Sequence, residues 1–211
     1  MNGLTQHRVL WGDLSPFAYL AGGALLVMAS DRMAHALTTL VALVWVYALS
    51  SLAVFGGSGF FPKRGGRVVF AFVASFVAGL FLLLLSILFP LAALQMFFVV
   101  SFVPALCAGS GLFGRLRNKT LTQTLRLSVA EALVAGVLIV ILALIREPLG
   151  FRSLSLPGGA QGIMLFHPFG EESAFFLRLL SGSAGALLLL GYVVGLYRRV
   201  RAKYSGEGDE R

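Results

Sequence analysis

Few residues in this sequence carry side chains that could do chemistry. Cys107 is the single cysteine, so no intrachain disulfide can form and cysteine alone cannot complete a metal site. Its thiol is either a metal ligand or a small apolar packing group, and both interpretations are open. Glu131 lies about one turn inside an apolar run, where a carboxylate is costly and often functional. The alternative is a carboxylate near the membrane surface that pairs with Arg126 or Arg117.

Arg146 and Glu147 stand together at the other end of the same apolar run. We expect them to pair across the membrane boundary or to anchor the following loop. His35 and His167 are lone histidines without a metal-binding neighbourhood. The sequence has no phosphate-binding glycine loop with its lysine, no H-E-x-x-H and no nucleophile elbow. It therefore predicts no catalytic residues, and we expect no catalysis by this chain alone.

The elements that carry these residues are apolar. Of the 211 residues, 58% are hydrophobic and only 12% are charged, and the mean hydropathy is +0.88. Several uncharged runs approach the roughly 20 residues that a helix needs to cross a bilayer. The runs are continuous and not alternating, which favours helices over a barrel. The net charge of +8 comes from basic residues in short linkers and the tail, a membrane-topology pattern that gives no reason to expect nucleic-acid binding.

We predict an all-α integral membrane protein, a single membrane domain over 1–211. Its six transmembrane helices are expected at about 14–29, 33–55, 68–89, 91–113, 127–145 and 174–197, with a cytoplasmic tail at 198–211. The first span contains Pro16 and two glycines, and the fourth contains Pro104 and three Gly/Ser residues, so both are predicted to be broken helices. The alternative for the first span is a signal peptide. The loop before the last span is expected to lie partly on the membrane surface.

Orientation follows from the lysine and arginine count on each side of this six-span arrangement. One side holds 13 of these residues and the other holds 4. Because cytoplasmic linkers carry the excess, both termini are predicted to be cytoplasmic in the plasma (inner) membrane.

The two broken spans are similar to each other, since residues 16–23 resemble residues 104–111. Each begins a group of three spans, repeat one at about 14–89 and repeat two at about 91–197. Three is an odd number, so the two repeats must be inverted, as in many transport proteins. In this interpretation four glycines let backbone approach an ion path or cofactor: Gly22, Gly23, Gly109 and Gly111. The alternative is that the same glycines allow close helix packing.

Two stretches, from Phe102 to Arg115 and from Leu144 to Phe151, are similar to the RnfE/NqrD family, membrane subunits of ion-translocating oxidoreductases. Arg146, Glu147 and Gly150 match its Arg-Glu-x-x-Gly signature. The resemblance implies a membrane subunit of an Rnf/Nqr-like electron-transfer complex that couples electron flow to Na+ or H+ translocation. The alternatives are a small ion or solute transporter, or substrate-binding membrane module, and an assembly subunit without a ligand.

The resemblance also implies partners and a cofactor. It implies other membrane subunits, including a homologous inverted subunit, and an iron-sulfur cluster shared with it. Cys107 would be a metal ligand, since thiolates hold such clusters. However, Ser15 stands where the first repeat is expected to carry a cysteine, and the family's Gly-Arg-Ala-Glu is replaced by residues 114–117, Gly-Arg-Leu-Arg. The cluster is then incomplete, completed by a partner, or lost.

Overall fold

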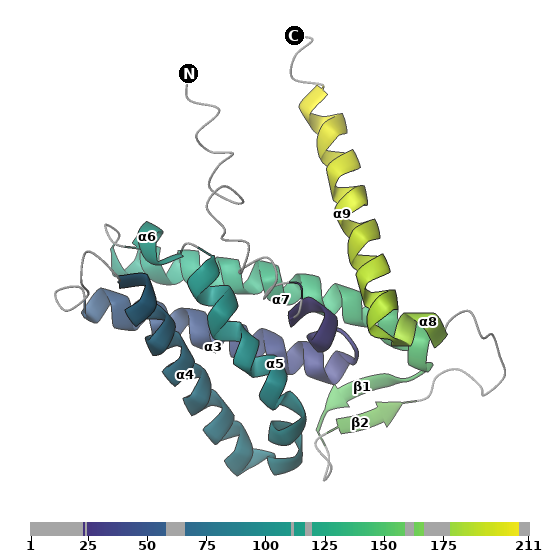
Figure 1. Cartoon of the computed structure of the whole chain (residues 1–211), viewed down its shortest axis with the longest axis horizontal. Coiled ribbons are helices and arrows are strands. Elements are labelled where there is room, and N and C mark those ends of the chain that lie inside the picture. Colours follow the sequence, from purple (N-terminus) through teal and green to yellow (C-terminus); the bar gives the residue numbers. More distant parts are fainter. Residues whose placement is uncertain are drawn as a thin grey trace.

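The chain is a multi-pass membrane protein. A computed structural model describes residues 23, 25–57, 66–110, 112–116, 120–158, 163–166 and 178–206. Four helices in this part are long and apolar enough to cross a bilayer (Figure 1): α3 (Met33–Gly56), α4 (Gly66–Leu88), α5 (Pro90–Gly109) and α7 (Leu121–Phe151). The predicted second and third spans are confirmed. The first span, at about 14–29, lies mostly outside the described residues.

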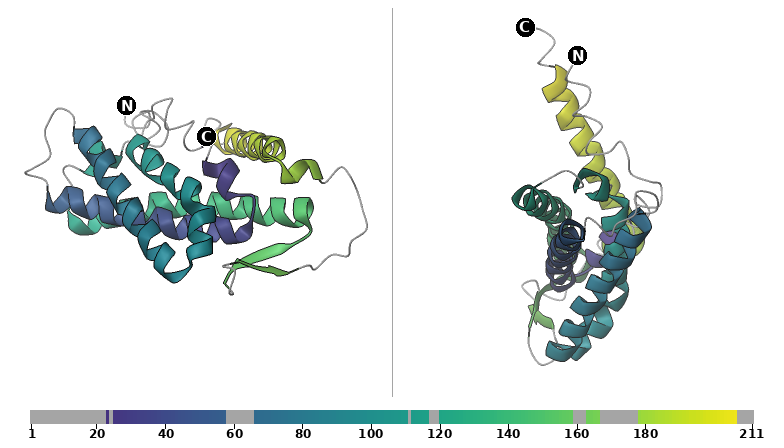
Figure 2. Two further views of the ribbon diagram at one scale, coloured as in Figure 1. Left: turned by 60° about the horizontal axis from the view of Figure 1, so that its bottom comes forward. Right: turned by 90° about the vertical axis from the view of Figure 1, so that its left-hand side faces the viewer.

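The four helices form two antiparallel pairs. In the first pair, the end of α7 meets the start of α3, and Gly136 of α7 lies against Leu40 of α3. In the second pair, α4 and α5 are joined by a tight turn in which Phe89 precedes Pro90, the first residue of α5. Proline suits a first helical position because its missing N–H would have no partner there. Figure 2 shows the α4–α5 pair against one side of the α3–α7 pair, and it packs mainly on α3.

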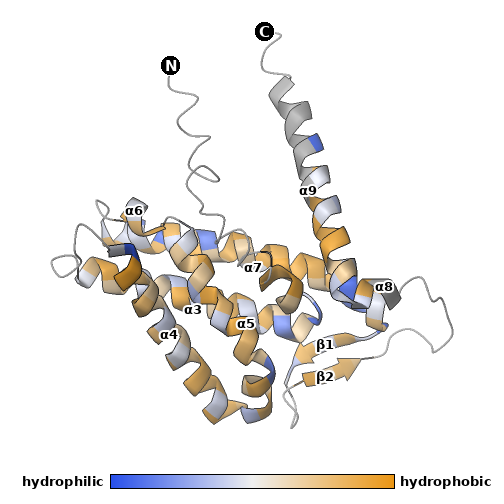
Figure 3. Ribbon diagram, in the orientation of Figure 1, coloured by the Kyte–Doolittle hydropathy of each residue, from blue (hydrophilic) through white to orange (hydrophobic). Residues whose placement is uncertain are grey.

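The outer surface of α4 and α5 is apolar. Phe72, Phe76, Leu94 and Phe98 are 72%, 68%, 75% and 69% exposed, and the hydropathy colouring of both helices is mainly orange (Figure 3). So many exposed aromatic and leucine side chains would favour aggregation in water, whereas lipid tails solvate them. The lipid bilayer is therefore the natural solvent of this pair.

The fifth span does not end at Ile145, so that prediction is wrong. Helix α7 continues through Pro148 to Phe151, and its 31 residues make it about 46 Å long. Arg152, in the left-handed conformation with φ 54°, ends it. The following segment is an antiparallel hairpin of β1 (Leu154–Pro157) and β2 (Ile163–Phe166), which the all-α prediction missed.

The other two predicted boundaries also shift. Pro104 lies inside α5 without ending it, since membrane helices tolerate a proline where neighbouring groups satisfy the freed backbone. The helix ends instead at Gly109, and the short α6 (Leu112–Leu116) follows. The predicted sixth span is divided into α8 (Arg178–Ser181) and α9 (Ser183–Gly206). The apolar part of α9, Ser183–Val193, is shorter than the roughly 20 residues of a full crossing.

Candidate functional site

Arg146 is the most completely bonded polar side chain among the described residues. Although it is charged, its side chain is only 3% exposed. Its Nε donates to the carbonyl of Leu180 at 2.9 Å. Its Nη1 donates to the carbonyl of Val27 at 2.9 Å and to Ser30 Oγ at 3.2 Å. Its Nη2 donates to the carbonyls of Ser181 and Gly182 at 2.9 and 3.1 Å. A guanidinium has five N–H groups, so all of them are used.

The oxygens around Arg146 come from two places where a helix stops. Val27 and Ser30 belong to the end of the helical segment 25–29, and Leu180 to Gly182 form the end of α8. The last carbonyls of a helix have no partner within it and carry partial negative charge. A cation at this point satisfies both helix ends, and it holds the segment before α3 against the segment before α9.

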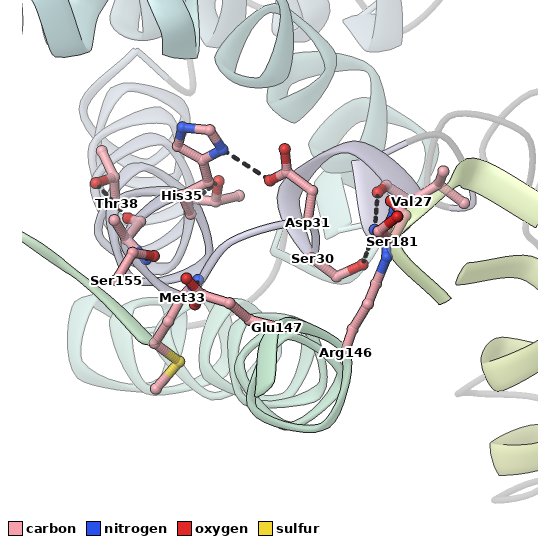
Figure 4. A network of polar contacts seen from close by, with 12 residues as sticks. Val27, Ser30, Asp31, Met33, His35, Thr38, Arg146, Glu147, Ser155 and Ser181 are labelled. Atoms are coloured by element: carbon pink, nitrogen blue, oxygen red, sulfur yellow. Dashed lines mark hydrogen bonds and ion pairs between the residues drawn. The ribbon is translucent and has the colours of Figure 1, made fainter. Parts of the chain in front are cut away.

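Glu147 leaves α7 in another direction, as Figure 4 shows. It is fully buried, and its Oε2 accepts a hydrogen bond of 2.7 Å from the backbone N–H of Met33, the first residue of α3. Its Oε1 also accepts a bond of 3.5 Å from Ser153 Oγ. A carboxylate at a helix N-terminus is favourable because the free N–H groups there carry partial positive charge. The hydrogen bonds of Arg146 and Glu147 therefore go to helix ends and not to each other.

We call this region the boundary junction; it consists of segment 25–35, the end of α7, the start of β1, and α8. Two further contacts hold it together. Ser155 Oγ of β1 accepts a 3.1 Å bond from the N–H of Ala34, which satisfies a second free donor of α3. Gly150 lies so close to α8 that an added Cβ would be 2.8 Å from the Ser181 nitrogen. Arg146 and Glu147 were predicted to pair with each other or to anchor the following loop. Within the described residues they instead bond mainly to segment 25–33 and to residues 180–182, and only the 3.5 Å bond from Ser153 to Glu147 reaches the segment that follows α7.

The connecting turn between 29 and 33 carries its own polar contacts. His35 Nδ1 and Asp31 Oδ1 are 2.7 Å apart, and the guanidinium of Arg32 lies 5.8 Å from the centre of the Phe151 ring. This second contact is a cation–π interaction that joins the turn to the last residue of α7.

A second polar region lies toward the start of α7, at the opposite end of this helix from the boundary junction. We call it the inner polar group: Ser50, Cys107, Thr124, Ser128 and Glu131. Thr124, Ser128 and Glu131 share one face of α7 at helical spacing. Glu131 interacts electrostatically with the Cys107 thiol of α5. Leu40 of α3 lies against Gly136 of α7. Because the two helices are antiparallel, Ser50, which follows Leu40 along α3, lies level with the turn of α7 that contains Thr124 and Ser128. Ser50 and Thr124 are fully buried, and their hydroxyl oxygens have no hydrogen-bond partner within the described residues.

Cys107 itself is fully buried in the apolar core. An iron-sulfur cluster needs four such ligands, yet among the described residues no group of three or more His, Cys, Asp or Glu could hold a metal. Because the chain's own side chains enclose Cys107, thiols of a partner could not reach it in this arrangement. The residues present do not fit a cluster shared with a partner; Ser15 lies outside the described residues.

The four glycines predicted to approach a cofactor are only partly described. Gly22 and Gly111 lie outside the described residues. An added Cβ at Gly23 would meet nothing within 4 Å, so no close backbone approach requires glycine there. Gly109 is the last residue of α5. Among the described glycines, Gly150 is the one whose added Cβ would lie within 3.0 Å of another segment's backbone, and the sequence indicated it only through the signature.

Sequence reasoning missed Ser30 and Ser155, which the boundary junction uses. The signal for Ser30 was weak, because one serine after an apolar run is ordinary. The chain matches no protein-family model and has no significant match among curated proteins. The similarity to the RnfE/NqrD family therefore remains a prediction, and function must be argued from these two polar regions.

Proposed function

We propose that the chain is a membrane subunit of an Rnf/Nqr-like electron-transfer complex, in which electron flow is coupled to Na+ or H+ movement. One observation carries this proposal. The three signature residues Arg146, Glu147 and Gly150 each make a contact at the boundary junction that another residue type would not make. Residues that belong to a family signature are expected to be engaged in contacts of this kind.

The proposed architecture has six transmembrane helices in two inverted repeats, with both termini cytoplasmic. The antiparallel packing of α3 and α7 supports it, because these are the second helices of the two proposed repeats and inversion requires them to be antiparallel. The end of α5 at Gly109 supports a break in the fourth helix at this place.

Within the complex we assign the chain a positioning and ion-coupling part, without catalysis of its own. Cys107 does not fit a cluster in this arrangement, so no electron-transfer step is assigned to it. Glu131 is the residue that we propose for ion coupling. It is an ionisable group within a spanning helix, and such groups often mark ion paths.

The test is a purification from native membranes through a tag on the full chain, followed by deletion of the chain. We expect flavin- and iron-containing membrane subunits to purify with it in fixed ratio. Membranes that lack it should lose electron-driven Na+ or H+ uptake. If the deletion leaves this uptake intact and the tagged chain carries no redox subunit, the proposal is wrong.

The alternative is a small ion or solute transporter that works without redox partners. The inner polar group favours this alternative, since buried hydroxyls near a carboxylate are suited to binding a cation or a polar solute within the membrane. The purified chain in lipid vesicles separates the two functions. Uptake of Na+ or H+ without any other subunit supports the transporter, and uptake only in the whole complex supports the first proposal.

A further inference from the structure

The oxygens around Arg146 form a shell that resembles a cation site. We call it the oxygen site: the carbonyls of Val27, Leu180, Ser181 and Gly182, and Ser30 Oγ. All five lie 2.9 to 3.2 Å from a guanidinium nitrogen. Four of them are backbone carbonyls at the ends of two interrupted helices, the arrangement that coordinates cations in broken-helix membrane proteins.

Among the described residues, no carboxylate forms an ion pair with the guanidinium of Arg146. The carboxylate of Glu147 is directed to the start of α3. That of Asp31 is 2.7 Å from His35 and acts on Arg146 only electrostatically. The positive charge is therefore held mainly by carbonyl dipoles and by one hydroxyl. Channel and transporter sites hold soluble cations in the same way.

The surroundings hold one side of the oxygen site in place. Gly182 also accepts a bond from the N–H of Ala186, at the start of α9, so its carbonyl is held from both sides. Gly150 of α7 brings the backbone of Ser181 within van der Waals contact. This side is therefore formed before the cation binds, which lowers the cost of binding, and the cation then brings Val27 and Ser30 to it.

From these contacts we infer that the oxygen site is a binding site for a monovalent cation of guanidinium shape, and that the guanidinium of Arg146 is its covalently attached occupant. When the side chain is removed, soluble guanidinium, which has the same planar shape and charge, binds the same five oxygens and again joins segment 25–30 to α8. This inference does not depend on the proposed function, because it concerns binding alone.

The experiment uses full-length protein in detergent micelles with Arg146→Ala. Thermal unfolding is followed while low-millimolar guanidinium or Na+ replaces N-methylglucamine at constant ionic strength. We expect Arg146→Ala to unfold at a lower temperature than wild type, and saturating guanidinium to raise its midpoint by about 5 °C. The wild-type midpoint should not change, since its site is already occupied.

Arg126→Ala is the matched control, because Arg126 is an exposed arginine on the same helix. It should give no cation-dependent rise. A second variant, Arg146→Ala with Ser30→Ala, lacks one of the five oxygens and should need a severalfold higher cation concentration for the same rise. If Arg146→Ala does not fold, the yield of folded protein with and without the cation in the solubilisation buffer gives the same comparison.

A saturable rise with guanidinium in Arg146→Ala, larger than any rise with Na+ and absent from Arg126→Ala, supports the site. If guanidinium does not stabilise or restore Arg146→Ala relative to N-methylglucamine, if Na+ does so equally well, or if wild type and Arg126→Ala respond equally, the inference is wrong. Electron transfer is not measured, so failure here leaves the proposed function untouched, and failure of the proposed function leaves this site untouched.

Discussion

The boundary junction and the inner polar group both bury polar side chains along α7, but the two regions differ in how far those side chains are hydrogen-bonded. At the junction, Arg146 has all five donors bonded and Glu147 is bonded through both oxygens. In the inner polar group, the hydroxyls of Ser50 and Thr124 are buried and make no hydrogen bond to the described chain. Fully satisfied polar groups rigidify a structure, whereas unsatisfied ones are places where water or an ion can enter.

Apart from Arg146→Ala, the largest effect is expected from Glu147→Ala. It removes the charge-assisted bond to the N–H of Met33, and we expect a loss of about 2–3 kcal/mol in the free energy of unfolding. Glu147→Gln keeps an oxygen acceptor and should lose less, about 1 kcal/mol. Reversible unfolding in micelles measures both. Equal stability of Glu147→Ala and wild type would mean that the junction does not hold the start of α3.

Next in size is Gly150→Ala, where the new Cβ would lie 2.8 Å from the backbone nitrogen of Ser181. Backbone cannot move aside as a flexible side chain can, so we expect a loss of about 2 kcal/mol from overpacking. Gly136→Ala meets only the Leu40 side chain and should lose less. Gly79→Ala, on an exposed face with nothing within 4 Å, is the control. Should all three variants be equally stable, α8 is not held closely against α7.

These two regions also differ in how far the sequence predicted them. Continuous apolar runs predicted the class and two helices, α3 and α4, within one or two residues of their bounds. The end of α7 was missed because a charged Arg146-Glu147 pair normally marks the end of a membrane span. Here the charges are bonded to the ends of other helices, and those partners lie more than 30 positions away along the chain. Local patterns contain no information about such partners.

The sequence predicted which residues belong to the candidate site but not which contacts they make. Glu131, Cys107, Arg146 and Glu147 were all singled out from residue type alone. The electrostatic interaction of Glu131 with Cys107 could not be predicted, because it depends on where the tertiary fold places the end of α5 relative to the start of α7. The hairpin of β1 and β2 was missed since its strands are only four residues long, too short to give a clear alternation.

A smaller effect is expected from Cys107→Ala. The side chain is buried in the apolar core, so deleting its sulfur should cost about 1 kcal/mol in the free energy of unfolding. Because Cys107 does not fit a shared cluster, we expect the iron content of the purified complex to be unchanged. Metal analysis of wild type and variant gives the answer. A fall in iron together with unchanged stability would make Cys107 a ligand, and the inner polar group would then be a cofactor site.

The smallest effect on stability is expected from Ser50→Ala and Thr124→Val. Replacing a buried hydroxyl that has no partner is nearly neutral, within about 0.5 kcal/mol, because no protein hydrogen bond is lost. If these hydroxyls hold water or an ion beside Glu131, ion uptake by the complex in vesicles should fall severalfold in the same variants. Normal folding with slowed ion movement is what the inner polar group predicts, and Ser75→Ala, which removes an exposed hydroxyl of α4, should change neither. A stability loss as large as that of Glu147→Ala would mean that the hydroxyls are bonded after all. The contrast between the two regions would then disappear, because both would serve to hold helices together.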